Sequence, residues 1–373
     1  MPLVVPRETS SALGPRGEQG PLCGQWYSCP IEAPVPHSAS DPPLPAPPRS
    51  HFQVLALDGG GVRGIFSAAL LAALEEDIGE PVVERFDLVV GTSTGGIIAL
   101  GLGAGLTPRE ILEFYLEEKG RIFANPLGWR RLRHPFVAKY RPKALERALR
   151  RIFGTTLVGE SRVPLVIPAY DIGENAVHLF KTPHHPRLRR DHRLQMWTVG
   201  MATSAGPTYF PAFRLPGDHV RLVDGGVWAN NPAMVGVTEA VSMFGQPLED
   251  VRVLSIGTTA SARTRPRRLD NAGALRWAQG PSVVEVLLTG QSAGAFAQVQ
   301  HLIGPGSARR LNPIAPDELA LLDTCDAEGL IAKAAHHSRV FCPTFEAEFA
   351  THTPAPYCPH HGPLAEAGTH AHQ

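Results

Sequence analysis

The segment most able to do chemistry is a serine with a glycine two residues to either side: Gly91, Ser93 and Gly95. An apolar run, 86–90, comes directly before it, and a helix-like run of small residues follows through Leu102. A sharp turn from strand to helix exposes a serine hydroxyl, and the glycines remove side chains that would collide there. The amino end of a helix also offers free N–H groups where negative charge develops. This setting predicts a nucleophilic Ser93; a turn that only links strand to helix is the alternative.

A glycine-rich segment earlier in the chain has two interpretations. Gly59, Gly61 and Gly64 match the spacing Gly-x-Gly-x-x-Gly of dinucleotide-binding proteins. In that fold the second strand ends in an acidic residue that binds the ribose hydroxyl. Here the second apolar run, 86–90, leads into Ser93 instead. A nucleotide-binding protein that uses this loop therefore stays as an alternative to an enzyme.

The same segment can supply the donors that a nucleophilic serine needs. Three consecutive glycines, Gly59, Gly60 and Gly61, let several backbone N–H groups converge on one point. Beside Ser93 this nest becomes an oxyanion hole, in which each donor typically contributes a factor of about 10²–10³ to the rate. Arg63 adds a positive charge that could brace the loop or favour the oxyanion, and an ordinary surface arginine is the alternative.

An aspartate, rather than a histidine, is the predicted base for this serine. Asp224 follows the apolar run Val220–Val223 and precedes Gly225 and Gly226. Glycines at a strand end permit close approach to another backbone, and a carboxylate in a dry site can take a serine proton once burial raises its pKa. His219, near it along the chain, lies in a Pro-Gly-Asp turn. A simple Asp-Gly-Gly turn is the alternative.

The motifs lie within an alternation of strand-like and helix-like runs. Short apolar runs predict buried strands at 52–57, 86–90, 163–168, 177–180, 220–223 and 251–256. Helices are predicted at 65–78 and 142–153, and another begins at a capping box formed by Thr107 and Glu110. This alternation predicts an α/β fold, a three-layer α/β/α sandwich with a mostly parallel central sheet.

Composition excludes several other classes of protein. Of 373 residues, 43% are hydrophobic and 19% charged, which supports a large core. The formal net charge is zero, whereas a protein that binds nucleic-acid duplexes normally carries a basic excess. The five cysteines include no Cys-x-x-Cys pair, so neither a zinc site nor a disulfide framework is indicated. We therefore predict no metal and no cofactor.

The composition changes towards both ends of the chain. Residues 1–49 hold twelve prolines and no periodic apolar pattern, which predicts a disordered extension. The folded domain is predicted at 50–345, with the motifs in 54–259 and a helical part in 270–340. Residues 346–373 form a low-complexity tail that is rich in histidine: His352, His360, His361, His370 and His372.

Taken together, the motifs resemble those of the patatin-like phospholipases. The segments that carry the resemblance are 58–64, 91–95, 202–211, 224–226 and 230–232. The resemblance implies a patatin-like fold and a lipid acyl hydrolase of phospholipase A type, which cleaves carboxylic esters of phospholipids through an acyl-enzyme. It makes Ser93 the nucleophile and Asp224 the general base. It also implies an oxyanion site built from Gly59, Gly60, Gly61 and Arg63, without a metal. A catalytically inactive lipid-binding protein is the remaining alternative.

Two basic clusters could bring the chain to anionic partners. Residues 121–151 contain eight arginines and two lysines against one acid, with interleaved aromatic residues, which could dock on anionic headgroups. Neutralising Arg130, Arg131 and Arg133 should then weaken binding to anionic vesicles while sparing a soluble ester. A solvated helix face is the alternative. The second cluster consists of Arg187, Arg189, Arg190, His192 and Arg193.

The expected location is the cytoplasm, with peripheral contact at the inner face of the membrane, because no apolar run is long enough to span a bilayer. Residues 106–170 resemble a bacterial subgroup of patatins, some of which are switched on by cyclic oligonucleotides. The resemblance therefore implies such an activator as a partner, beside a phospholipid or other acyl-lipid substrate.

Overall fold

The computed structural model describes residues 51–123, 138–261, 270–271, 273, 282–315 and 326–370. The predicted extension at 1–49 and the arginines at 130, 131 and 133 lie outside these residues. The strands are β1 (Phe52–Leu57), β2 (Leu88–Gly91), β3 (Leu165–Asp171), β4 (Ala176–Lys181), β5 (Phe213–Arg214), β6 (Arg221–Asp224), β7 (Val251–Ile256), β8 (Ala260–Ser261), β9 (Ala308–Leu311) and β10 (Ile314–Ala315). The α-helices are α1 (Gly64–Ile78), α2 (Thr94–Gly103), α3 (Pro108–Ile122), α5 (Pro142–Phe153), α6 (Met196–Thr203), α7 (Gly226–Ala229), α8 (Ala233–Ser242), α10 (Ser282–Ile303), α11 (Ala327–Glu348) and α12 (Pro363–His370). Short 3₁₀ turns are η1 (Gly61–Arg63), η2 (Val82–Arg85), η3 (Val158–Glu160), η4 (Asp191–Arg193) and η5 (Leu248–Asp250).

The central sheet confirms the predicted α/β class. Its order is β5-β6-β3-β2-β1-β7-β9, and β4 pairs with β3 beside this path. The pairs β1–β2, β1–β7, β2–β3 and β7–β9 are parallel, whereas the pairs with β4, β5 and β6 are antiparallel. The predicted bounds of β1 and β7 match, while β3 extends three residues past its predicted end. The predicted capping box also forms, with Thr107 accepting from the backbone N–H of Glu110.

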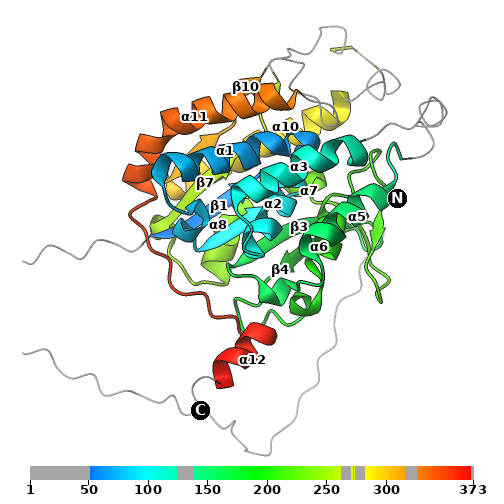
Figure 1. Ribbon diagram of the computed structural model, residues 1–373, viewed down its shortest axis with the longest axis horizontal. Helices are drawn as coiled ribbons and strands as arrows, with labels where there is room; N and C mark the ends of the chain where they lie inside the picture. The colour runs from blue at the N-terminus through cyan, green and yellow to red at the C-terminus, as the bar shows by residue number, and fades with distance from the viewer. Residues whose placement is uncertain are drawn as a thin grey trace, which may run out of the picture. The chain divides into compact units, whose positions relative to one another are not determined.

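Alternate residues of the central strands supply two separate cores. In β1, Leu55 and Leu57 pack in the core that contains α1, α2, α3 and α11. Val54 and Ala56, which point to the opposite face, pack with α8 and α10. Figure 1 shows α1 and α11, far apart in the chain, lying side by side over the first face, and these two helices are in extensive contact. Burial on both faces explains why the strands are continuous apolar runs.

The strand pairing brings the ends of β2 and β6 to the same edge of β3. Val166 in β3 pairs with Lys181 of β4 and with Val90 of β2, so β2 and β4 lie on opposite edges. Further along β3, Ala169 pairs with His178 of β4 and with Asp224 of β6. Because β4 follows one edge throughout, β2 and β6 must share the other edge. Parallel β2 and antiparallel β6 therefore meet end to end.

The C-terminal residues pack against the domain. Helix α11 continues to Glu348, past the domain boundary predicted at 345. Beyond it, the Phe349 carbonyl accepts from the Gln53 side chain, and the His352 ring contacts Asp87 at 2.7 Å. None of the described helices combines the length and apolar character that crossing a bilayer requires.

Candidate active site

The turn between β2 and α2 holds Ser93 in a strained conformation. Ser93 has φ 55° and ψ −120°, a region that non-glycine residues rarely occupy. The turn is also too tight for side chains at its flanks. A Cβ on Gly91 would lie 2.2 Å from the Gly95 carbonyl oxygen, and one on Gly95 would lie 2.2 Å from that of Leu57. The two glycines are therefore needed to form this elbow, which presents the Ser93 hydroxyl at the end of β2.

Two threonines fix the backbone of this turn. The Thr203 hydroxyl accepts from the Ser93 N–H at 2.9 Å and donates to the Pro168 carbonyl at 2.7 Å. On the other side, the Thr92 hydroxyl donates to the Ala229 carbonyl at 2.6 Å. The sequence analysis did not single out Thr203, although this residue lies in segment 202–211, which contributed to the resemblance. Only the fold shows that the end of α6 supports Ser93.

Asp224 lies directly opposite the serine hydroxyl. Ser93 Oγ donates to Asp224 Oδ2 at 2.6 Å, and the Gly226 N–H donates to Asp224 Oδ1 at 2.7 Å. The meeting of β2 and β6 on one edge of β3 explains this contact between residues far apart in the chain. Gly225 allows it, because a Cβ there would lie 2.4 Å from the Pro168 carbonyl oxygen.

The surroundings of Asp224 make it a stronger base than a solvated carboxylate. Burial raises the pKa of Asp224 to about 6, while the hydrogen bonds from Ser93 and Gly226 act in the opposite direction. A carboxylate with this pKa is ionised at neutral pH and is better matched to accept a proton. The pair can therefore transfer a proton from the serine hydroxyl to the carboxylate.

The glycine loop after β1 lies beside the serine, but its three glycines differ. Gly60 and Gly61 line the same cavity as Ser93, and Gly61 has φ 59°. The Gly59 N–H is already donated to the Asn230 carbonyl at 2.9 Å. A Cβ on Gly59 would also lie 2.5 Å from Asn230 Oδ1. Gly59 thus closes the loop against Asn230, whereas Gly60 and Gly61 are the glycines that face the cavity at Ser93.

Arg63 contacts the loop rather than the serine. Its Nε donates to the Gly60 carbonyl at 3.4 Å, and its Nη1 donates to the Thr259 carbonyl at 3.1 Å. The side chain lines a separate polar cavity and not the cavity at Ser93. Arg63 therefore stabilises the position of Gly60 from the side of the loop that faces away from the cavity at Ser93.

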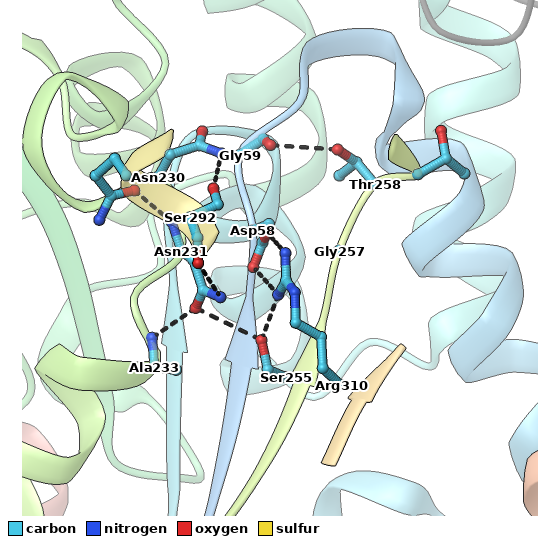
Figure 2. A network of polar contacts seen from close by, with 12 residues as sticks. Asp58, Gly59, Asn230, Asn231, Ala233, Ser255, Gly257, Thr258, Ser292 and Arg310 are labelled. Carbon is cyan, nitrogen blue, oxygen red and sulfur yellow. Dashed lines mark hydrogen bonds and ion pairs between the residues drawn. The ribbon is translucent and has the colours of Figure 1, made fainter. Parts of the chain in front are cut away.

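A buried ion pair anchors the start of the glycine loop (Figure 2). Arg310 of β9 donates to both carboxylate oxygens of Asp58, at 2.6 and 3.2 Å, and to Ser255 Oγ at 2.6 Å. Ser255 and Arg310 are partners in the register of β7 and β9, which places the guanidinium under the loop. On the far side, Thr258 donates to the Gly59 carbonyl at 3.3 Å. No local sequence pattern marks Arg310, because only the pairing of β7 with β9 brings it to Asp58.

The cavity at the serine has a volume of about 310 Å³ and is mostly apolar. Its apolar walls include Ile97, Phe114, Ile122, Leu145, Phe210 and Leu288. Such a lining suits a hydrocarbon chain. Within the part of the chain that the structure describes, no cluster of three His, Cys, Asp or Glu side chains could hold a metal.

The third glycine of the nucleotide-type fingerprint has a packing role. A Cβ on Gly64 would lie 2.0 Å from Thr94 Oγ1, so this glycine lets α1 begin against the start of α2. The fingerprint loop is therefore packed against the serine turn. Glycine-dependent contact of this kind explains the spacing without a bound nucleotide.

The family model and the sequence relatives agree on one family. The model of the patatin-like phospholipase family matches residues 55–237. A Pseudomonas aeruginosa protein named cGAMP-activated phospholipase is 35% identical over 271 residues, which are 72% of this chain and 80% of that protein. Patatin-like protein 4 of Arabidopsis thaliana is 34% identical over 241 residues, which are 56% of this chain and 60% of that protein. Among solved structures, VipD from Legionella pneumophila matches with a TM-score of 0.35 and 12% identity, over 80% of this chain and 76% of that chain.

Proposed function

This chain belongs to the patatin-like phospholipase family and is a lipid acyl hydrolase, and from that premise we propose that Ser93 and Asp224 are its catalytic dyad. The observation that carries the proposal is the 2.6 Å hydrogen bond from Ser93 Oγ to Asp224 Oδ2. It joins a strained serine to a carboxylate whose pKa is raised to about 6.

The reaction begins when Asp224 takes the hydroxyl proton and Ser93 Oγ attacks the ester carbonyl carbon. The carbonyl oxygen becomes negative in the tetrahedral intermediate and accepts from the N–H groups of Gly60 and Gly61. Gly59 and Arg63 support this loop through their contacts with Asn230 and Gly60. Collapse of the intermediate breaks the ester bond, and the proton on Asp224 passes to the leaving alcohol.

A second round of the same chemistry releases the fatty acid. Asp224 takes a proton from water, the hydroxide attacks the acyl carbonyl, and the proton returns to Ser93 as the free carboxylic acid leaves. The acyl chain occupies the apolar cavity, whose lining fits a phospholipid or other acyl-lipid substrate. Within the described residues, this mechanism uses only side chains and backbone amides.

Fatty-acid release from defined phospholipids tests the dyad. We expect wild-type protein to release fatty acid, and Ser93→Ala to be lower by about 10⁴–10⁶-fold, as for other serine hydrolases. An acylating ester probe should label wild-type protein and not Ser93→Ala. Release by a well-folded Ser93→Ala protein at the wild-type rate would contradict the proposal.

An activator and a membrane surface complete the proposal. Since the 35% identical relative is named a cGAMP-activated phospholipase, we propose that a cyclic oligonucleotide also switches on this chain. The expected result is faster fatty-acid release when the dinucleotide cGAMP is added. The same release with and without cGAMP would contradict this part alone.

We propose that the basic stretch 121–151 contacts the inner face of an anionic membrane peripherally. Several of its described arginines have acidic partners on α3 and α5: Arg121 pairs with Glu118, Arg151 with Glu117 and Glu118, and Arg150 with Glu146. The proposal therefore rests on the arginines at 130, 131 and 133. Changing these three to serine should reduce co-sedimentation with anionic vesicles, and unchanged co-sedimentation would contradict it.

A further inference from the structure

Two residue clusters with no role in the proposed reaction meet in one cleft of about 520 Å³. One wall comes from the second basic cluster, with Arg189, His192 and Arg193. The other comes from the C-terminal residues, with His360, His361 and Glu366. No residue that lines this cleft also lines the cavity at Ser93. The cleft is therefore a separate feature of the molecule.

Specific contacts hold the two walls together. The His360 N–H donates to the Pro183 carbonyl at 2.7 Å, and His361 Nε2 lies 2.8 Å from the Pro186 carbonyl oxygen. A carbonyl oxygen only accepts, so His361 Nε2 carries the proton of this bond. Gly362 continues the contact with φ 94°. These bonds fix the C-terminal residues against the segment that carries the basic cluster.

The cleft carries uncompensated positive charge. Among the described residues, no side-chain hydrogen bond or ion pair is formed by Arg193, and the Arg189 side chain bonds only to the Pro186 carbonyl. The neighbouring Asp191 does not neutralise them, because Arg190 already contacts its carboxylate at 2.6 Å. Glu366, an exposed side chain, is the acidic residue in the lining. The lining thus presents two arginines and three histidines against one carboxylate.

His192 shows the effect of this crowding. Its side chain is buried, with 7% of its surface exposed, and its Nδ1 has no partner among the described residues. Burial lowers the pKa of His192, and the positive neighbours Arg193 and His361 lower it further, while Asp191 and a hydrogen bond with the Arg189 backbone act in the opposite direction. A buried ring nitrogen without a partner, in a lining that also holds two guanidinium groups, is typical of a site that a hydrogen-bonding anion completes.

We propose that this cleft binds a phosphate-bearing small molecule of about nucleotide size. Guanidinium groups bind phosphate through paired N–H donors, which makes Arg189 and Arg193 the principal contacts. The volume falls within the range of small-molecule sites and exceeds the needs of a single phosphate ion. Both a soluble nucleotide and a phospholipid head group carry this chemistry.

Helix α6 connects the region of the cleft with the region of Ser93. Arg193 is three residues before Met196, where α6 begins, and the last residue of α6 is Thr203. Thr203 accepts the hydrogen bond from the Ser93 N–H. A molecule bound at the cleft would therefore lie beside the start of the helix that supports the nucleophile.

Binding measurements on the full chain test the proposal. Calorimetry with cGAMP and co-sedimentation with phosphatidylglycerol vesicles distinguish a soluble ligand from a head group. We expect one of these probes to bind, and the double variant Arg189→Ala/Arg193→Ala to weaken its binding at least about tenfold, since each charged hydrogen bond typically contributes that much or more. The matched control is Arg187→Ala, which removes a charge of the same cluster outside the cleft and should bind within about twofold of wild type.

Three results would overturn the site: equal binding by the double variant and wild type, an equal loss in Arg187→Ala, or failure of both larger probes to bind, whether or not inorganic phosphate binds. An equal loss of binding in Arg187→Ala would show that the ligand responds to the overall positive charge of the cluster and not to specific contacts in the cleft. Hydrolysis of a soluble ester, measured in parallel, should be unchanged in the double variant because neither arginine lies at the dyad. Binding and hydrolysis are read separately, so failure of this site and failure of the dyad can be told apart.

Discussion

Two aspartates at the ends of buried strands have similar sequence settings and different chemistry. Asp58 follows β1 and precedes three glycines, and Asp224 ends β6 and precedes two. Burial raises the pKa of both carboxyl groups. Asp58 has the guanidinium of Arg310 against both oxygens, whereas among the described residues the Asp224 carboxylate has only the Ser93 hydroxyl and the Gly226 N–H as partners.

The partner decides which carboxylate can react. A guanidinium is a permanent cation, so Arg310 opposes the rise in the pKa of Asp58 and fixes the carboxylate in direction, and proton transfer to Asp58 would leave the arginine without its counter-ion. A hydroxyl is neutral and can itself lose a proton, so Asp224 can exchange one with Ser93. The first aspartate therefore supports the glycine loop, and the second is the one we propose as the catalytic base.

The largest expected effect separates the two aspartates by activity. Asp224→Asn should lower kcat for ester hydrolysis by about 10⁴-fold, because the amide cannot accept the serine proton. Its stability should not fall, since the change removes a half-buried charge that has no cation among its described contacts. Esterase assays and urea unfolding of the same sample measure both. Strong hydrolysis by Asp224→Asn would break the comparison.

The second effect concerns stability at the other aspartate. Arg310→Met should lower the free energy of unfolding by about 3–5 kcal/mol, because it leaves the Asp58 carboxylate buried without a counter-ion. Adding Asp58→Asn to this variant should recover part of the loss, since both charges are then absent. Urea unfolding of the two single variants and the double variant gives the coupling. Purely additive losses would show that the ion pair does not anchor the loop.

A smaller effect is expected at the support of Ser93. Thr203→Val keeps the shape but leaves the Ser93 N–H and the Pro168 carbonyl without their buried partner, at a cost of about 1–3 kcal/mol. We expect kcat to fall about tenfold or more, with KM little changed, because the residue positions the nucleophile and does not bind the acyl chain.

Two variants bracket that effect. Thr203→Ser keeps the hydroxyl and should retain most of the wild-type kcat. Thr238→Val removes an exposed hydroxyl that donates to the Met234 carbonyl within α8, and it should leave kcat unchanged. If Thr203→Val matched the Thr238→Val control, Thr203 would have no positioning role.

The sequence predicted the parts of this site that depend on local rules. The apolar runs of β1 and β7 and the capping box at Thr107 depend on neighbours along the chain, and the structure matches them. The Ser93 turn also shows in local spacing, because its glycines are required within a few residues. Thr203 and Arg310 could not be found this way. Their roles depend on which elements lie side by side, and a lone threonine or arginine carries no local pattern.

The same limit applies to the C-terminal residues. Their composition predicted a low-complexity tail, but composition does not record where backbone N–H and C=O groups find partners. The contacts of Phe349 with Gln53 and of His360 with Pro183 arise only once the sheet is formed. Tertiary partners therefore decide the conformation of these residues.

The pH dependence gives the smallest expected effect and bears on Asp224 alone. Its pKa is raised to about 6, and the ionised form is the base, so kcat/KM should rise about tenfold per pH unit below 6 and level off above it. The sign for stability is opposite. A carboxyl whose pKa is 3.8 unfolded and about 6 folded binds its proton more tightly when folded, so its stabilising contribution is complete below pH 3.8 and is lost as the pH rises through 6. Asp224→Asn should therefore gain stability relative to wild type between pH 4 and pH 7. An activity midpoint near pH 4 would mean that the carboxylate is solvated as an ordinary aspartate, and the contrast with Asp58 would then rest on geometry alone.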